Sequence, residues 1–395
     1  MPLPTLIDRA RGCLLGLAIG DALGAPLEGL SPQQIRAHYG PVVDYVDGAR
    51  AWRRKPFRWR LPGLYTDDTQ QAMALAEIML RYGTIEPQRL AELYLALATP
   101  RAGYVGAHRG VGRSFRQVLD ELERGVPPSQ TGQASAGIGA AMRIAPVAIY
   151  FMEQAEPRFE AVMAASLMTH RDIRSLAGAM AVAHACARLL SGEPRTPSLL
   201  FRLASDVARA EDRIAQQYAG SIASLGSHRR SLSSSIAHVE AVLDFPRERA
   251  LVALVEEANR HGAEPVCRRP TMGFPPACIP TCLYLLLTTD SFEEALIDVV
   301  NLGGDADSAG AILGAFAGAT LGVNSLPERW LLGLQNREGI DRRALALVEP
   351  DQYDASSFEE FLETERSLSR REAASREELM AQNSNGDDLG ANRHR

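Results

Sequence analysis

The sequence predicts an all-α protein that folds as a compact, single-domain bundle of many helices. Apolar residues recur at spacings of three and four along most of the chain, and the good helix formers alanine and leucine are abundant. Alternating runs of β-branched residues are nearly absent. With 395 residues, of which 46% are hydrophobic, the chain is long enough to bury a large core.

Each predicted helix begins or ends at a change in this pattern. The apolar run that opens at Gly12 passes directly into a helical pattern and is interpreted as the first core helix. Gly125-Val126-Pro127-Pro128 and Gly192-Glu193-Pro194 end the helices before them, since glycine and proline do not readily continue a helix. Further helices are predicted at residues 69–82, 87–97, 114–124, 139–152, 158–168, 173–190, 199–218, 247–260, 279–287, 292–300 and 309–321.

The segments between the helices are predicted to be loops, and none resembles a hinge between two cores. The serine-rich run 231–235 is expected to lie in a surface loop. Residues 1–350 are therefore assigned to one domain. Residues 351–395, rich in charge and serine, are assigned to a charged tail that is part helical and disordered at its end. The predicted loops fall at residues 46–63, 101–112, 127–137, 221–235 and 268–276.

Charge and cysteine content narrow the class of protein. The net charge of -6 offers no basic footprint for a phosphate backbone, so nucleic acid is not an expected partner. Five cysteines at irregular spacing do not form a disulfide framework, which favours the cytoplasm. The apolar run that starts at Gly12 soon meets Asp21, and residues 309–323 are too few to cross a bilayer, so no membrane span is predicted. The sequence indicates no oligomeric state.

Two predicted helices carry glycine at every fourth position. In a helix this spacing leaves a bare stripe on which another backbone can approach closely. Each glycine costs a helix about 1 kcal/mol relative to alanine, so the close approach must be required. We expect both helices to lie centrally and to pack tightly against neighbours, with each other as one candidate partner. The stripes consist of Gly12, Gly16, Gly20 and Gly24, and of Gly310, Gly314, Gly318 and Gly322.

The segment Thr66-Asp67-Asp68 stands at the predicted start of a helix. Asp67 with Gln70 three residues later resembles a capping box, and carboxylates suit the positive end of a helix. Capping needs only one aspartate, however, and the pair behind a hydroxyl offers three adjacent oxygen ligands. By itself this segment favours capping.

A second acidic segment changes that interpretation. Asp305-Ala306-Asp307-Ser308 also stands at the mouth of a helix, after two glycines. Both segments offer only oxygen donors, which suits Mg²⁺, Mn²⁺ or Ca²⁺ and argues against zinc or copper. Four converging carboxylates would repel one another strongly without cations. If the two segments meet, a metal site is the natural explanation.

Together these segments resemble the ADP-ribosylglycohydrolase family, which includes ADP-ribosylarginine and ADP-ribosylserine hydrolases and the enzyme that reactivates dinitrogenase reductase. The resemblance runs from about Arg11 to about Leu347. Several separated motifs in the same order carry it, and they are more specific together than a lone Thr-Asp-Asp. They are Gly16 to Gly24 with Gly20-Asp21-Ala22-Leu23-Gly24, Glu28, Thr66-Asp67-Asp68-Thr69, Gly137 to Pro146, Thr169-His170, and Asn301 to Ser308.

The resemblance implies an all-α hydrolase domain with two divalent cations, Mg²⁺ or Mn²⁺. It assigns Glu28, as a residue that positions or deprotonates water, together with Asp67 and Asp68, to catalysis. The family usually has threonine at the position of Ser308, which keeps the hydroxyl. The implied metal ligands are Thr66, Asp67, Asp68, Asp305, Asp307 and Ser308.

The resemblance also implies a set of substrate contacts. Ser135, Gly137 and Gly139 match the loop that cradles the pyrophosphate and the distal ribose, and His170 matches a histidine beside the substrate. Ile138 departs from the family, which commonly has asparagine there, and this points to an altered substrate contact. Arg143 fits either a phosphate contact or a salt-bridged support within the core.

The implied reaction removes ADP-ribose from an ADP-ribosylated protein or a small ADP-ribose conjugate. An arginine N-linkage is the first expectation, and a serine or other O-linkage is the second; ADP-ribosylated nucleic acid stays open. Two alternatives remain beside it. One is a family member that binds ADP-ribose or serves a structural role without catalysis, and the other is a metal-dependent phosphoesterase.

Overall fold

The computed structural model describes residues 3–99, 106–222 and 228–391, with side chains as far as residue 381. The described residues form helices and short 3-10 turns and contain no strand, which confirms the all-α prediction; one isolated bridge joins Gln133 and His170. The helices are α1 Leu6–Gly24, α2 Pro32–Tyr39, α3 Ala49–Trp52, α4 Asp67–Tyr82, α5 Pro87–Ala98, α6 Arg113–Glu123, α7 Ala145–Tyr150, α8 Ala155–Leu167, α9 Ile173–Leu190, α10 Pro197–Gln217, α11 Ser231–His238, α12 Arg247–Arg260, α13 Pro275–Thr288, α14 Phe292–Val300, α15 Ala306–Leu321, α16 Glu328–Gly333, α17 Arg337–Val348 and α18 Ser357–Ala391.

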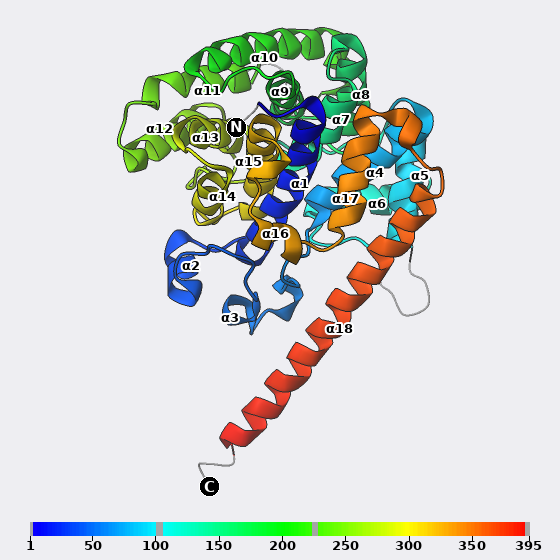
Figure 1. Ribbon diagram of the computed structural model, residues 1–395, viewed down its shortest axis with the longest axis vertical. Coiled ribbons are helices and arrows are strands. Elements are labelled where there is room, and N and C mark those ends of the chain that lie inside the picture. The colour runs from blue at the N-terminus through cyan, green and yellow to red at the C-terminus, as the bar shows by residue number, and fades with distance from the viewer. Residues whose placement is uncertain (1–2, 100–105, 223–227, 392–395) are drawn as a thin grey trace.

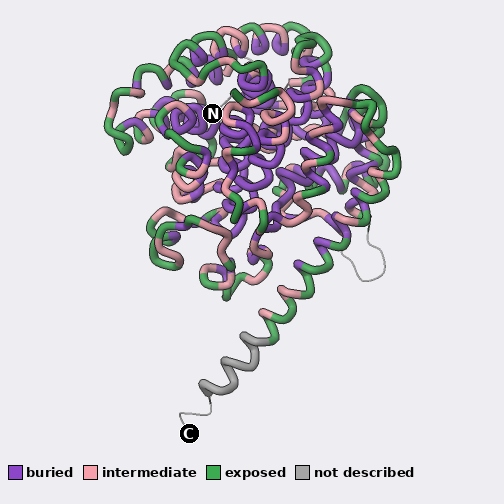
Figure 2. The backbone as a smooth tube through the Cα atoms, viewed as in Figure 1, coloured by how far each residue is buried: buried purple, intermediate pink, exposed green. Residues whose placement is uncertain are grey.

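Helices α1 and α15 lie side by side at the centre of the bundle (Figure 1). Their glycine stripes face each other, because a Cβ atom added to Gly16 would collide with the carbonyl of Gly314, and one added to Gly20 with that of Gly310. Buried residues concentrate around this pair (Figure 2). The predicted close packing of the two glycine helices is confirmed, and it brings the C-terminal end of α1 beside the N-terminal end of α15.

The prediction of one continuous helix at residues 139–152 is wrong. The segment forms a 3-10 turn, Ile138–Ala140, and then a separate helix, α7. Pro146 stands in the first turn of α7, where its missing N–H group is tolerated. Proline is unfavourable in the interior of a continuous helix, so the helix begins anew just before Pro146.

The serine-rich run that was expected to form a surface loop is also different, because it begins helix α11. Ser231, Ser233 and Ser235 are buried there. Glu211 accepts hydrogen bonds from the Leu232 N–H group (3.0 Å) and from the Ser233 hydroxyl (2.5 Å). A carboxylate distant in sequence thus satisfies the start of the helix.

Helix α18 leaves the bundle as a long arm (Figure 1). Its first turns pack into the bundle, because Phe361, Leu362 and Leu368 are buried. The division of the chain into a domain at 1–350 and a tail at 351–395 stays a prediction, although these residues contribute to the same hydrophobic core.

Two helical segments of the described chain are long and apolar enough to cross a membrane by composition. They are Leu6–Leu27, which includes α1, and Ile173–Leu190, which is α9. In the structure 94% and 89% of the residues in these windows are buried inside the protein. Both segments therefore serve as core helices of the bundle.

Candidate functional site

The two acidic helix starts line one pocket of about 220 Å³. It lies where α4 and α15 begin. Of the predicted site residues only Thr66 does not line it, since Thr66 is buried beneath the pocket wall. The predicted residues that do line the pocket are Glu28, Asp67, Asp68, Ser135, Gly137, Gly139, His170, Asp305, Asp307 and Ser308, with Ile138 and Arg143 beside them.

Asp21 of α1 holds the start of α4 through hydrogen bonds. Its carboxylate accepts hydrogen bonds from the N–H group (2.9 Å) and hydroxyl (2.9 Å) of Thr66 and from the N–H group (3.0 Å) and hydroxyl (2.7 Å) of Thr69. The side chain of Asp21 is fully buried. Because α1 supplies Asp21, the glycine contact with α15 also fixes where α4 begins.

The capping-box interpretation of Asp67 and Gln70 is wrong in the structure. Thr66 occupies the N-cap position, Asp67 is the first helical residue, and the Thr66 side chain makes no capping hydrogen bond. The Gln70 amide instead donates to the carbonyl oxygen of Ala107 (3.0 Å) and to Glu365 (2.8 Å). Asp67 and Asp68 are thus free of the capping role that competed with a functional one.

The start of α15 is shaped by two glycines and a neighbouring loop. Gly303 and Gly304 have φ values of 65° and 72°, in the left-handed region that favours glycine. The N–H group of Asp305 donates to the carbonyl oxygen of Thr271 (2.9 Å). Gly273 packs against the Asp305 carboxylate, where a side chain would collide with it. The loop before α13 therefore aims Asp305.

Glu28 reaches the pocket from the segment after α1. Gly29 donates its N–H group to the carbonyl oxygen of Gly304 (2.6 Å), and Gly304 donates to that of Leu30 (2.9 Å). These two bonds tie the Glu28 segment to the acidic start of α15. The side chain of Glu28 is half-buried at the pocket wall.

The carboxylates of the pocket raise one another's pKa. Burial, together with the charges of Asp21 and Glu28, raises the pKa of Asp67 to about 8. Burial and the charge of Glu28 raise the pKa of Asp305 to about 6. The pKa values of Asp68 and Asp307 lie well above their ordinary range for the same two reasons, burial first and neighbouring acids second. The acidic segments at the starts of α4 and α15 therefore meet in one pocket, which is the condition that the sequence analysis set for a metal site.

The donor set fits divalent cations that prefer oxygen. The Oδ1 atom of Asp68 is buried and has no hydrogen-bond partner, which in a folded protein calls for a cation or an ordered water. In the described part of the chain no three acidic, histidine or cysteine side chains stand in a ready ligating arrangement. The fit therefore rests on the chemistry of the donors and on their mutual repulsion.

The predicted substrate residues line the same pocket. His170 packs against Gly139, because a Cβ atom built on Gly139 would stand 3.0 Å from the Cε1 atom of His170. The Nδ1 atom of His170 lies 2.8 Å from the Thr169 hydroxyl. The N–H group of Gly137 donates to the Ser135 hydroxyl (3.3 Å). The N–H group of Ile138 donates to the carbonyl oxygen of Gly273 (3.0 Å). Both N–H groups are thus bonded within the protein.

Arg143 acts as a support, but not through a salt bridge. Its guanidinium is 1% exposed and donates to Gln71 Oε1, to the carbonyl oxygen of Ala165 (2.9 Å) and to the Thr169 hydroxyl (2.7 Å). These acceptors are neutral side-chain or backbone groups. Arg143 thereby joins the start of α4 to the segment that carries His170.

The sequence interpretation missed several residues that shape this pocket. In the sequence analysis Asp21 counts only as an interruption of an apolar run. A charged residue inside a core helix nevertheless indicates buried hydrogen-bond partners, because burial of an unpaired carboxylate is costly. Gly110 and Gly112, with the first residues of α6, Arg113, Ser114 and Phe115, also line the pocket. Gly110 has a φ of 76° and lies against Thr66. A Cβ atom built on Gly110 would stand 3.0 Å from the Cβ atom of Thr66.

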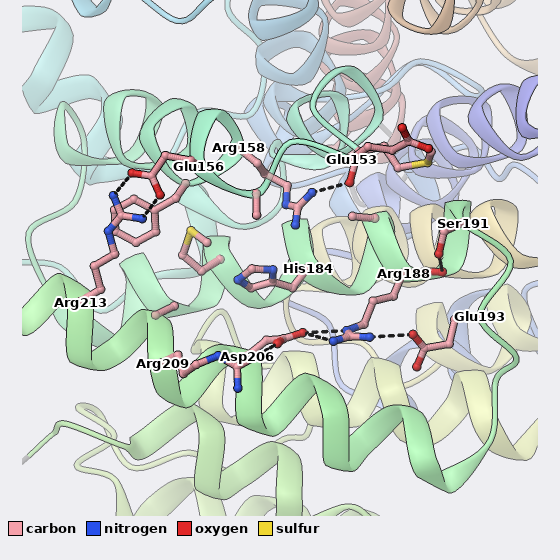
Figure 3. A pocket seen from close by; sticks show the side chains of 16 residues that line it. Glu153, Glu156, Arg158, His184, Arg188, Ser191, Glu193, Asp206, Arg209 and Arg213 are labelled. Atoms are coloured by element: carbon pink, nitrogen blue, oxygen red, sulfur yellow. Dashed lines mark hydrogen bonds and ion pairs between the residues drawn. The ribbon is translucent and has the colours of Figure 1, made fainter.

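A larger hollow of about 530 Å³ lies elsewhere, between α8, α9 and α10 (Figure 3). None of the predicted site residues lines it. Its charged side chains are largely paired with one another: Arg188 contacts Asp206 (2.5 Å) and Glu193 (2.7 Å), and Arg213 contacts Glu156 (2.5 Å). Among the described residues, Asp67, Asp68, Asp305 and Asp307 form no such ion pairs, so the acidic pocket is the candidate site.

Comparison with known proteins agrees with this geometry. Residues 2–356 match the ADP-ribosylglycohydrolase family. The chain is 28% identical to ADP-ribosyl-[dinitrogen reductase] glycohydrolase of Rhodospirillum rubrum, over 87% of this chain and 97% of that protein. It is 26% identical to ADP-ribosylarginine hydrolase Tri1 of Serratia proteamaculans, over 86% of this chain and 78% of that protein. A solved ADP-ribosylglycohydrolase-related protein complex superposes with a TM-score of 0.60 at 27% identity, covering 87% of this chain and 98% of that chain.

Fold and relatives together define the protein as a hydrolase of glycosidic bonds. The chain belongs to the ADP-ribosylglycohydrolase family.

Proposed function

We propose that this enzyme removes ADP-ribose from arginine side chains of modified proteins, using two divalent cations, Mg²⁺ or Mn²⁺. The observation that carries the proposal is the convergence of two acidic helix starts in one pocket, where the pKa values of Asp67 and Asp305 are raised and where, in the described part of the chain, no arginine or lysine forms an ion pair with them. The proposed ligands are Thr66, Asp67, Asp68, Asp305, Asp307 and Ser308.

The proposed reaction is hydrolysis at the anomeric carbon of the distal ribose. The bond from this carbon to the arginine nitrogen breaks, the water oxygen takes its place, and the leaving guanidine receives a proton. When bound, the cations would orient the ribose hydroxyls and acidify a water molecule. Glu28, at the pocket wall, is the residue proposed to position or deprotonate the attacking water.

The arginine linkage is supported by a relative whose name states that substrate. A serine or other O-linkage is the second candidate, because the pocket itself does not distinguish the leaving group. Ile138, which is 4% exposed and places an apolar side chain at the pocket wall, is the feature that favours an ADP-ribose binder without catalysis. The experiment below separates these candidates.

The test offers purified protein, with Mg²⁺ or Mn²⁺, substrates that carry arginine-, serine- or acyl-linked ADP-ribose. We expect ADP-ribose release from the arginine adduct, and its loss in the double variant Asp67→Ala, Asp307→Ala. The exposed pair Asp120→Ala, Asp351→Ala is the matched control and should retain activity. Release from none of the three adducts, with metal bound, would overturn the hydrolase proposal, and binding of ADP-ribose alone would establish the binder.

A metal-dependent phosphoesterase is distinguished in the same assay by its product. Cleavage of the pyrophosphate would yield AMP and leave a phosphoribosyl group on the protein. Hydrolysis at the anomeric carbon yields intact ADP-ribose and unmodified arginine. Mass spectrometry of the released nucleotide decides between them.

A further inference from the structure

Helix α18 begins at Ser357, immediately after the region that matches the family. One carboxylate in its early turns, Glu365, is 0% exposed. A fully buried glutamate on an added helix requires strong partners, because a desolvated charge is costly unless it is paired and hydrogen-bonded. Its partners identify what the helix contacts.

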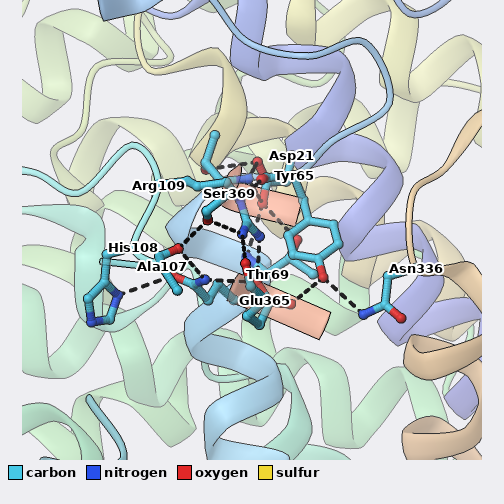
Figure 4. A network of polar contacts seen from close by, with 11 residues as sticks. Asp21, Tyr65, Thr69, Ala107, His108, Arg109, Asn336, Glu365 and Ser369 are labelled. Atoms are coloured by element: carbon cyan, nitrogen blue, oxygen red, sulfur yellow. Dashed lines mark hydrogen bonds and ion pairs between the residues drawn. The ribbon is translucent and has the colours of Figure 1, made fainter. Parts of the chain in front are cut away.

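Glu365 binds three groups that come from different parts of the bundle (Figure 4). Its Oε1 atom accepts a hydrogen bond from the Tyr65 hydroxyl (2.5 Å). Its Oε2 atom accepts from the Gln70 amide (2.8 Å) and forms an ion pair with Arg109 (2.6 Å). The carboxylate thus joins α18 to the start of α4 and to the loop before α6.

Each of these partners lies directly beside the acidic pocket. Tyr65 precedes Thr66, and Gln70 is in the first turns of α4, which carry Asp67 and Asp68. Arg109 precedes Gly110, and its guanidinium donates to the carbonyl oxygen of Tyr65 (3.2 Å). Glu365 therefore lies behind the pocket wall, where it contacts the start of α4 and the loop that carries Arg109. It does not line the pocket itself.

A second contact from α18 secures the same loop. The Ser369 hydroxyl donates to the carbonyl oxygen of Ala107 (2.6 Å) and accepts from Arg109 (2.9 Å). Ala107 also receives the Gln70 amide (3.0 Å). Two successive turns of α18 thus bind the 107–110 segment to α4.

We propose that Glu365 is a positioning residue: it holds the Thr66-Asp67-Asp68 turn and the Gly110 loop in register, so that α18 tunes cation and substrate binding from outside the family region. This inference rests on the proposed function for its meaning, although the positioning itself does not depend on which bond is cleaved. A buried ion pair adds little net stability but fixes geometry through its hydrogen bonds.

The chain supplies a matched control for this proposal. Glu77, farther along α4, is also 0% exposed and also pairs with a buried arginine, Arg343 (2.5 Å), and a tyrosine hydroxyl, that of Tyr353 (2.8 Å). Ten residues of helix place it about 15 Å from Asp67. Glu77→Gln therefore removes the same kind of pair from the same helix, away from the pocket.

The experiment compares Glu365→Gln with Glu77→Gln in the full chain. We expect both variants to melt at a similarly lowered temperature. Only Glu365→Gln should weaken Mn²⁺ binding, measured by titration with the metal alone, by roughly tenfold or more, as outer partners of metal ligands typically do. Only Glu365→Gln should also speed amide hydrogen exchange in residues 64–72 and 106–113.

Equal Mn²⁺ affinity and equal exchange in the two variants would overturn the proposal. If the wild type neither binds Mn²⁺ nor releases ADP-ribose, the proposed function fails, while the exchange comparison still decides the role of Glu365. If Glu365→Gln does not fold, Tyr65→Phe with Tyr353→Phe as its control removes one hydroxyl from each network. Faster exchange at residues 64–72 and 106–113 in Tyr65→Phe alone supports the proposal, and its absence contradicts it.

Discussion

Gly16 of α1 and Gly314 of α15 meet backbone to backbone, with no room for a methyl group on either. The carbonyl of each glycine occupies the place that the other's Cβ would take. Such a contact differs from ordinary core packing, because a backbone cannot change rotamer to make space. The acidic start of α15, which lies against Gly24, inherits its position from this contact, and so does the start of α4, which Asp21 of α1 holds.

Substitution in this seam should unfold the protein. We expect Gly16→Leu and Gly314→Leu to prevent folding, and the corresponding alanine variants to cost roughly 3 kcal/mol or more, at the upper end of typical overpacking. Thermal unfolding followed by circular dichroism provides the measurement. Gly220→Ala, where a Cβ meets nothing within 4 Å, is the control. Unchanged melting of the seam variants would contradict this packing.

Asp21→Asn should separate the start of α4 from the core. The carboxylate accepts bonds from four donors, and an amide would turn its own NH₂ group toward some of them. We expect a loss of about 2 kcal/mol in the free energy of unfolding, since hydrogen bonds to a charged group are worth about 1.5–3 kcal/mol. Chemical denaturation measures it. We also expect Mn²⁺ affinity to fall by roughly tenfold or more, and an unchanged affinity would contradict the positioning role of Asp21.

The metal-free protein should lose stability as pH rises. The folded pKa values of Asp67 and Asp305, about 8 and about 6, exceed the ordinary value of 3.8. A raised folded pKa means that the stabilising contribution is complete below the unfolded value and is lost as pH rises through the folded one. We therefore expect the melting temperature in EDTA to fall between about pH 4 and 8.

Two comparisons test this pH dependence. In Asp67→Asn the fall should be shallower, because one of the mutually repelling groups no longer ionises. Mn²⁺ should raise the melting temperature of the wild type most at the alkaline end, where the carboxylates are free of protons. A slope that is identical in wild type and variant would show that the four acids do not interact as described.

His170 should not act as a general acid or base. Burial first, and then the charge of Arg143, lowers its pKa to about 3, so the imidazole is neutral throughout the physiological range. We expect His170→Asn to keep kcat within about tenfold and to raise KM, since a binding contact acts on the ground state and the transition state alike. A pH-rate profile in which the variant lacks a step near pH 6 to 7 seen in the wild type would contradict this.

The acidic segments could be predicted because each is contiguous in the sequence. Asp67 and Asp68 are neighbours, and Asp305 and Asp307 follow two glycines, so their chemistry is visible without a fold. The glycine stripes were predictable for the same reason, since a period of four is a local property. The way in which the stripes bring Asp21 beneath Thr66 was not, because it depends on residues 45 positions apart.

Two of the errors share a cause: a partner far away in the sequence. The serines of α11 read as a loop until Glu211 is placed at the start of the helix. Gln70 reads as half of a capping box until Glu365, 295 residues later, receives its amide. Pro146 was different, because its effect on the predicted helix is local and the break before α7 was available from the sequence.

The seam between α1 and α15 also has a consequence for biosynthesis. Helix α1 leaves the ribosome long before α15, which begins at Ala306. At about 5–20 residues per second, the bare glycine stripe waits on the order of tens of seconds for its partner. The pocket proposed to bind cations is not assembled until Asp305 has emerged, and Glu365, its proposed support, emerges only after that.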